Sequence, residues 1–311
     1  MSYSPKKRCF RIFLYILLIF SFYTSVVAQN ANPLKAPVYQ SIEVALAENK
    51  RATQLNFRDR HLFQISDSIK LLKNLRFINL MGNNLETLNP HLFSLKKLEV
   101  LNLMLNSLKY IPEEIDQLKN LIRLNLSNNE IAEVPTGINK LRNLRYLHLS
   151  FNYITVLPES INKCKSLEVL ELDNNQLSFM PHTFFEVRKL KSLDLGFNQF
   201  NEFNEGWSQL EKLEELNMEH NQLQHLPKEI GTFHNLKSLL LNDNKLKSLP
   251  ESFSNLESLE LLILSNNHLK TMPNHLEKLK NLKTLILVGN PIAASEKERI
   301  KGLLPNCSVY F

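Results

Sequence analysis

The chain has 311 residues, and its 37 Lys and Arg against 31 Asp and Glu give a formal net charge of +6. Four of the positive charges, Lys6, Lys7, Arg8 and Arg11, lie in residues 1–28, which contain no Asp or Glu, so the remainder carries only +2. The body of the protein therefore lacks the strongly basic composition typical of nucleic-acid-binding proteins, and we expect no nucleic-acid partner. Its 43% hydrophobic and 22% charged residues are ordinary for a folded soluble chain.

In residues 1–28, basic, apolar and small residues follow one another in the order typical of a secretory signal peptide. The basic residues precede an apolar run around Ile12 to Phe22, and Val26 and Ala28 suit the −3 and −1 positions of cleavage before Gln29. The alternative is an uncleaved membrane anchor, but the run is short for a hydrocarbon core of about 30 Å. We therefore predict an exported protein, secreted, periplasmic or at the cell surface, with no stable membrane insertion after cleavage.

Two short segments lead into the body of the chain. Residues 29–40, with Pro33 and Pro37, are predicted to be a mobile segment. Residues 41–51 are predicted to be an N-terminal helical cap, with Ser41 as its N-cap and an apolar side formed by Ile42, Ala45 and Leu46. Such a cap covers the exposed end of a repeat array.

One motif of 23 residues then recurs without insertion. Its clearest copy, LIRLNLSNNEIAEVPTGINKL, runs from Leu121 to Leu141. Steps of 23 residues from Leu121 give eleven openings, at Ala52, Leu75, Leu98, Leu121, Leu144, Leu167, Leu190, Leu213, Leu236, Leu259 and Leu282. A fixed period of this length with this leucine pattern indicates a solenoid of stacked repeats.

The physical role of each position can be read from that copy. Leu124 and Leu126 alternate with polar residues, which predicts a short strand with one buried face. Asn129 follows, where its amide can satisfy backbone groups and stack with equivalent asparagines in a ladder. Pro135 favours a short helical or 3-10 return segment. The ladder position holds Asn83, Asn106, Asn129, Asn152, Asn175, Asn198, Asn221, Asn244, Asn267 and Asn290, with Arg60 in the first copy.

This pattern resembles the leucine-rich repeat family, in its 23-residue class with an L-P-x-x-I return segment. The resemblance covers residues 52–291 and implies an α/β solenoid, a curved horseshoe of about eleven repeats. Its parallel β-sheet would line the concave side, and short helical or 3-10 segments the convex side. The family's habit of binding partners on the concave face implies a binding role without identifying the partner.

Two copies depart from the pattern. In the copy that opens at Leu75, Asn89-Pro90 reverses the usual leucine-proline order. The copy that opens at Leu190 lacks the proline at Phe203-Asn204, and Trp207 replaces an inward isoleucine. We interpret these departures as local repacking of the core with larger side chains. The alternative is a local bend that alters the concave surface beside it.

Residues 292–311 are predicted to be a C-terminal cap. Ser295 and Glu298 have the spacing of a capping box that opens a helix, and Pro305 is expected to end that helix. The segment from Cys307 to Phe311 is predicted to be a closing strand, with Val309 and Phe311 pointing inward.

The sequence offers little that suggests catalysis. It has no glycine-rich phosphate loop, no G-x-S-x-G elbow and no H-E-x-x-H pair, so we expect no enzymatic activity, no cofactor and no metal site. Cys164 and Cys307 lie about six repeats apart, roughly 30 Å, and are predicted to be free thiols. Extracellular relatives in animals and plants usually have cysteine-rich caps. The absence of cysteine-rich caps from this sequence favours a bacterial exported protein.

The middle of the concave face gathers five acidic residues in three consecutive copies, beside exposed aromatic residues. Because aromatic side chains are enriched at the centres of interfaces, we predict a protein or peptide ligand of basic character here. A solvated face and a bound cation are the alternatives. The predicted partner-binding residues are Tyr146, His148, Phe151, Tyr153, Glu171, Asp173, Asp194, Phe197, Glu215 and Glu219.

The C-terminal part of the same face is apolar instead. Contiguous exposed apolar area is unusual on monomers, so a second hypothesis is a structural or adhesion component that associates with itself there. Cover by the cap, or ordinary filling of strand positions, would explain the same residues. They are Leu240, Leu261, Ile263, Ile286 and Val288.

Overall fold

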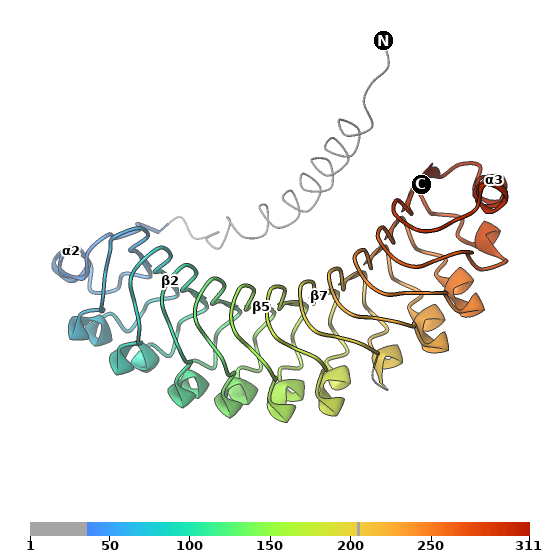
Figure 1. Cartoon of the computed structure of the whole chain (residues 1–311). Coiled ribbons are helices and arrows are strands. Elements are labelled where there is room, and N and C mark those ends of the chain that lie inside the picture. Colours follow the sequence, from blue (N-terminus) through green and yellow to red (C-terminus); the bar gives the residue numbers. More distant parts are fainter. Residues whose placement is uncertain (1–35, 204–205) are drawn as a thin grey trace, which may run out of the picture.

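The computed structural model describes residues 36–203 and 206–311, which form one curved solenoid (Figure 1). Twelve parallel strands pair in sequence order from β1 to β12. The eleven predicted copies supply one strand each, and the pairings between them advance by 23 residues, as in Leu124 opposite Leu147. The closing strand β12 pairs with β11 at a separation of 24 residues, as in Leu285 opposite Val309. The strands are β1 Gln54–Asn56, β2 Phe77–Asn79, β3 Val100–Asn102, β4 Arg123–Asn125, β5 Tyr146–His148, β6 Val169–Glu171, β7 Ser192–Asp194, β8 Glu215–Asn217, β9 Ser238–Leu240, β10 Leu261–Ile263, β11 Thr284–Ile286 and β12 Ser308–Tyr310.

The return segments are short 3-10 helices on the convex side, as predicted (Figure 1). In the clearest copy Pro135 is the extended N-cap of such a helix, where its missing N–H is no loss. The helices are η1 Asp67–Leu71, η2 Pro90–Ser94, η3 Glu113–Gln117, η4 Thr136–Lys140, η5 Glu159–Lys163, η6 His182–Glu186, η7 Trp207–Gln209, η8 Lys228–Thr232, η9 Glu251–Asn255 and η10 Leu276–Lys278.

The core lies between the sheet and these helices. Leu124 and Leu126 of the strand side and Ile138 of the return side are all buried, and the equivalent residues of the other copies continue the same core along the solenoid. A single copy is too thin to bury its own apolar face, so each copy depends on its neighbours for burial.

The predicted asparagine ladder is confirmed. The Asn175 Nδ2 donates to the carbonyl oxygens of Leu149 and Leu172, each at 3.0 Å, and its Oδ1 accepts from the Ile154 N–H at 3.0 Å. One side chain thus satisfies three backbone groups in two copies. The other nine ladder asparagines repeat this arrangement.

Helix α2, Ile42–Glu48, covers the first copy, and Ser41 caps it by accepting a hydrogen bond from the Val44 N–H at 3.3 Å, as predicted. At the other end, α3 spans Ala294–Leu303, and β12 pairs with β11 as the predicted closing strand. Val309 and Phe311 pack against the core.

The capping box predicted at Ser295 is wrong, because α3 begins at Ala294, so Ser295 already lies inside the helix, and the N-cap Ala293 makes no side-chain bond. The Glu296 carboxylate is instead bound across the interface with the preceding copy. It accepts from the Met272 N–H at 2.8 Å and from Arg299 at 2.7 Å. Glu296 therefore joins α3 to the neighbouring copy instead of capping the helix locally.

The copy that opens at Leu190 lacks the usual proline and isoleucine, and aromatic side chains pack in their place. Trp207 is buried, with ring centres 5.4 Å from Phe185 and 4.7 Å from Phe203. Gly206 has φ of +103° and a Cβ there would lie 2.6 Å from the Phe185 ring, so only glycine fits. The pairing of β7 with β8 keeps the common register, with Leu193 opposite Leu216, which supports repacking over a bend of the sheet.

The predicted signal peptide, residues 1–28, and most of the predicted mobile segment lie outside the described residues. In the part of the chain that is described, we find no helix with the length and apolar character needed to cross a membrane.

The ladder makes a direct prediction for stability. Replacing Asn175 by alanine leaves buried backbone groups unpaired, so unfolding should become easier by about 1–3 kcal/mol. The exposed Asn255 at the end of η9 is the matched control, and its alanine variant should stay within about 0.5 kcal/mol of the parent. Denaturant unfolding measures both, and equal losses would contradict a special role for the ladder.

Candidate functional site

The concave face is built from the first and third residues of each strand. In β6, Val169 and Glu171 flank the buried Leu170 and remain partly exposed. The sheet register places Glu171 directly between His148 of β5 and Asp194 of β7. The structure therefore brings the central predicted residues together on neighbouring strands, about 4.8 Å apart.

Basic groups accompany the first of these acids. The His148 Nδ1 lies 2.6 Å from the Glu171 Oε2. On β4, the Arg123 guanidinium lies 4.5 Å from the centre of the Tyr146 ring of β5. The Arg145 guanidinium, just before β5, lies 5.3 Å from the same ring. Sequence reasoning missed Arg123, although it occupies the strand position opposite Tyr146.

Hydrogen bonds from adjacent side chains hold three other acids. Asp173 accepts from the Ser150 hydroxyl and, at 2.9 Å, from the Asn174 amide. The Ser192 hydroxyl donates to Glu215 at 2.9 Å. The Glu219 carboxylate accepts from Asn217 at 3.3 Å and from Asn242 at 2.9 Å. The carboxylates are therefore fixed in place rather than freely rotating.

Asp194 differs from its equivalents in other copies. At this strand position Asn56, Asn79, Asn102, Asn125 and Asn217 each accept a hydrogen bond from the N–H two residues later. Asp194 makes the same bond to the Gly196 N–H at 3.0 Å, but with a carboxylate. Burial, followed by the charges of Asp173 and Glu171, raises the pKa of Asp194 well above its usual range, even though solvent still reaches part of the residue.

The predicted aromatic residues divide into two places. Tyr146 lies on the sheet, whereas Phe151, Tyr153 and Phe197 lie beyond the strand ends and are 51%, 54% and 43% exposed. Phe197 stacks on His220, with ring centres 4.1 Å apart and planes 18° apart. These residues thus border the acidic array rather than lie within it.

The predicted apolar strip forms a separate small cluster on the sheet. Leu240, Ile263 and Ile286 are only 4–6% exposed and pack with the partly buried Leu261 and Val288. These side chains cover one another, which leaves little apolar area for another molecule.

Both described cysteines are free, as predicted. Burial raises the pKa of the Cys164 thiol to about 12 and that of the Cys307 thiol to about 11. Neither group is therefore a thiolate near neutral pH, which is the form that acts as a nucleophile. Among the described residues, no group of three or more His, Cys, Asp or Glu is arranged to hold a metal ion.

The chain is similar to protein-family models and to solved structures. A family model described as a leucine-rich repeat region matches residues 135–222. Two other models, each described as a leucine rich repeat, match residues 73–131 and 234–292, and residues 212–233. No curated protein matches. A leucine-rich repeat protein of Leptospira interrogans is 33% identical, with a TM-score of 0.50 and 84% of each chain covered.

Two receptor structures are also similar. A TDR receptor is 29% identical with a TM-score of 0.77, and the match covers 93% of this chain but 52% of the receptor. The plant peptide hormone receptor RGFR1 in complex with RGF2 is 23% identical with a TM-score of 0.63, covering 82% of this chain and 46% of the receptor. At that identity the second likeness concerns the fold alone.

The raised pKa of Asp194 predicts that the stability of the fold depends on pH. The folded state holds this proton more tightly than the unfolded state, so stability falls as pH rises from the ordinary value of 3.8 through the raised one. Asp194→Asn keeps the bond to Gly196 and removes the charge. It should melt at a higher temperature than the parent at neutral pH, with the difference shrinking as pH falls toward 3.8. A lower melting temperature at neutral pH would show that the carboxylate stabilises the fold.

Proposed function

We propose that this chain, which belongs to the leucine-rich repeat family, is a non-catalytic scaffold that binds a protein or peptide on its concave face. The observation that carries this proposal is the fixed array of Glu171, Asp173 and Asp194 on adjacent strands. Asp194 stands where five other copies have asparagine, and its charge disfavours the folded state. Asparagine makes the same bond to the backbone without a charge, so the scaffold does not need the carboxylate of Asp194, and its presence points to a role in binding.

A basic partner fits this array. A positive group placed beside Asp194 would favour its ionised form and offset the repulsion from Asp173 and Glu171. Binding would therefore release a proton when the solution pH lies below the raised pKa. The side chains are already held in position, so little conformational entropy is lost when the partner binds.

The similar structures support the same class of function. One of them is a peptide hormone receptor in complex with RGF2. Another is a receptor kinase ectodomain in complex with CASPARIAN STRIP INTEGRITY FACTOR 2. This ectodomain is 24% identical to this chain with a TM-score of 0.60, and the match covers 87% of this chain. They share the fold, so a long curved sheet of this kind can present a binding surface. The partner and the residues that contact it have to come from this chain's own side chains.

The place of action is proposed from the leader. A basic stretch, an apolar run and Val26 and Ala28 before Gln29 favour export to the secretory or periplasmic space. The alternative function, self-association through the apolar strip of Leu240, Ile263 and Ile286, has less support, because these side chains expose only 4–6% of their surface.

Export predicts a defined N-terminus. The protein recovered from outside the cytoplasm should begin at Gln29 or within a few residues of it. Intact-mass measurement and N-terminal sequencing test this directly. Recovery of the uncleaved chain in the membrane fraction would instead support the anchor.

The concave array predicts a charge-dependent partner. The double variant Glu171→Gln, Asp194→Asn keeps the shape of the site and should recover a basic partner from the source's extracellular fraction about tenfold less efficiently than the parent. Recovery by the parent should decline as salt rises, because screening weakens the attraction.

A bound cation such as calcium is the competing explanation for the acidic array, and the same variant tests it. If a cation occupies the array, added calcium should raise the melting temperature of the parent, and a chelator should remove the gain. Equal partner recovery by parent and variant, with no effect of calcium on either, would mean that the array is only a solvated face.

A further inference from the structure

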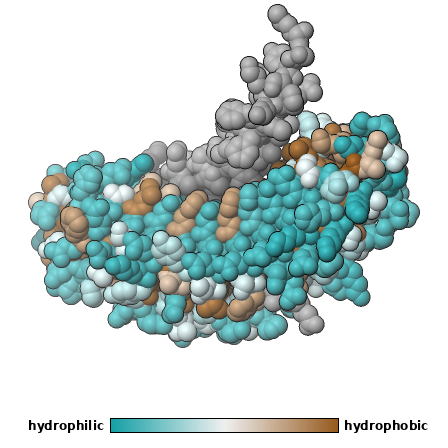
Figure 2. All heavy atoms as spheres, in the orientation of Figure 1, coloured by the Kyte–Doolittle hydropathy of each residue, from teal (hydrophilic) through white to brown (hydrophobic). Residues whose placement is uncertain are grey.

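Exposed apolar side chains gather on one flank of the solenoid. We define this flank as the residues between each ladder asparagine and the following return helix, together with the rim position just before that asparagine. Twelve large apolar side chains are exposed in the described part of the chain, and seven lie on this flank: Leu105, Tyr110, Phe151, Tyr153, Val156, Phe179 and Phe197. Figure 2 shows brown and tan side chains along the left and middle of the near flank, whereas its right part is hydrophilic.

The rim position makes three of these residues unexpected. Every copy has a positive φ at this position, and most copies fill it with Asn, Asp or Gly, the residues that tolerate a left-handed backbone. Leu105, Phe151 and Phe197 adopt φ of 57°, 55° and 53° there, although each is 43–51% exposed. Their side chains add strain and remain exposed, even where Phe197 stacks on the His220 ring, so burial within the fold does not account for them.

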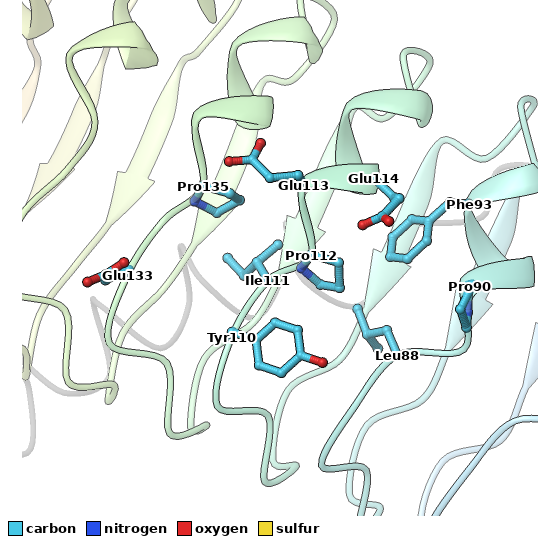
Figure 3. A pocket seen from close by; sticks show the side chains of 10 residues that line it. All are labelled: Leu88, Pro90, Phe93, Tyr110, Ile111, Pro112, Glu113, Glu114, Glu133 and Pro135. Carbon is cyan, nitrogen blue, oxygen red and sulfur yellow. The ribbon is translucent and has the colours of Figure 1, made fainter.

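A pocket continues the flank toward the convex side (Figure 3). It has a volume of about 570 Å³ and lies between the return segments of three successive copies. Leu88, Tyr110, Ile111 and Pro112 form apolar walls, and the Glu114 carboxylate lies beside the Phe93 ring. Glu133 lines the pocket from the next copy. Apolar walls with carboxylates at the edge suit the aliphatic stem and charged end of a lysine or arginine.

The charges on this part of the flank are mainly negative. Glu130, Glu133 and Glu202 are exposed, and none of them forms a salt bridge with another described residue, while Lys109 lies 3.9 Å from Glu86. Further along, the flank changes sign and carries Lys245, Lys247 and Lys270 against one acid, Asp243 at the rim, which lies 3.3 Å from His220. A basic segment is therefore attracted to the part with exposed apolar residues and repelled from the C-terminal part.

We propose that this flank, from the copy that opens at Leu98 to the copy that opens at Leu190, docks an extended basic segment of a protein partner. A lysine or arginine of the segment enters the pocket, where its stem packs on Ile111 and Pro112 and its charge lies beside Glu114, while Glu133 adds negative charge at the opposite edge. The Tyr110 ring offers a face for the same cation. This surface adjoins the concave array at the rim, but its pocket and the carboxylates of Glu114 and Glu133 are not part of that array.

The spacing of the rim residues defines the partner further. Leu105, Phe151 and Phe197 recur at every second copy, which is about 9.6 Å along the sheet at 4.8 Å per strand. An extended polyproline-type segment rises about 3.1 Å per residue, so its every third side chain recurs at about 9.3 Å. The partner segment therefore carries an apolar side chain at every third position, with basic residues between.

A designed peptide tests the proposal without knowledge of the natural partner. The probe is a fluorescein-labelled peptide of four Leu-Arg-Pro units, and fluorescence anisotropy measures its binding to the full-length protein. Peptides of four Leu-Glu-Pro or four Ser-Arg-Pro units are the controls, and each should bind at least about tenfold more weakly. If either control binds as tightly as the probe, the proposed partner chemistry is wrong.

Variants locate the binding surface. Glu114→Gln with Glu133→Gln should weaken probe binding about tenfold. Phe151→Asn should do the same without lowering the melting temperature, because asparagine tolerates the left-handed backbone. His225→Ser is the matched control, since His225 is exposed at the same flank position as Tyr110 in a copy outside the proposed surface, and it should bind as the parent does.

The concave variant separates this proposal from the preceding one. Glu171→Gln with Asp194→Asn should bind the probe as the parent does. If that variant loses binding while the flank variants keep it, the probe occupies the concave face and the flank proposal fails. A fall in melting temperature on Phe151→Asn would show that the aromatic ring serves the fold, which would also count against docking.

Discussion

The structure depends on one side chain that joins neighbouring copies. Each ladder asparagine, such as Asn175, bonds two carbonyl groups and one N–H that belong to two successive copies. A buried backbone group without a partner is costly, so an insertion of even one residue would break several of these bonds at once. This constraint explains why the 23-residue spacing never slips between Ala52 and Leu282.

A scaffold held in this way leaves the outward positions free to vary, and the copies serve as controls for one another. Asparagine is the common residue at the central strand position, which makes the carboxylate of Asp194 conspicuous. Asn, Asp or Gly is usual at the rim, which makes Phe151 and Phe197 conspicuous. In both places the unusual residue opposes folding, through charge in one and backbone strain in the other.

The two candidate surfaces meet at the rim. The Phe151 N–H donates to the carbonyl oxygen of Asp173 at 2.9 Å, so the aromatic edge of the flank directly borders the acidic array of the sheet. Negative charge prevails on both surfaces in the same copies, while the flank becomes basic toward the C-terminus. The charge pattern thus gives the solenoid an acidic central part and a basic flank near one end, which orients a charged partner along its length.

The sequence by itself determined the features that arise within one copy or from strict repetition. Alternating leucines predicted the strands, Pro135 predicted the 3-10 return, and the ladder asparagines predicted the contact between copies, because each depends on residues close in sequence or 23 apart. Burial of Trp207 followed from the same register.

Tertiary structure decided what depends on side-chain conformation and on contact between copies. α3 starts at Ala294, and Glu296 binds the Met272 N–H of the preceding copy instead of taking part in a local cap. The left-handed backbone at Phe151 turns an apparent sheet residue into a rim residue, and the mutual packing of Ile263 and Ile286 hides an apparently exposed strip. The pocket beside Tyr110 exists only where three return segments stack. A periodic sequence specifies which residues are neighbours, but the exposed area, the direction of each side chain and the charges that face one another depend on how the stacked copies pack.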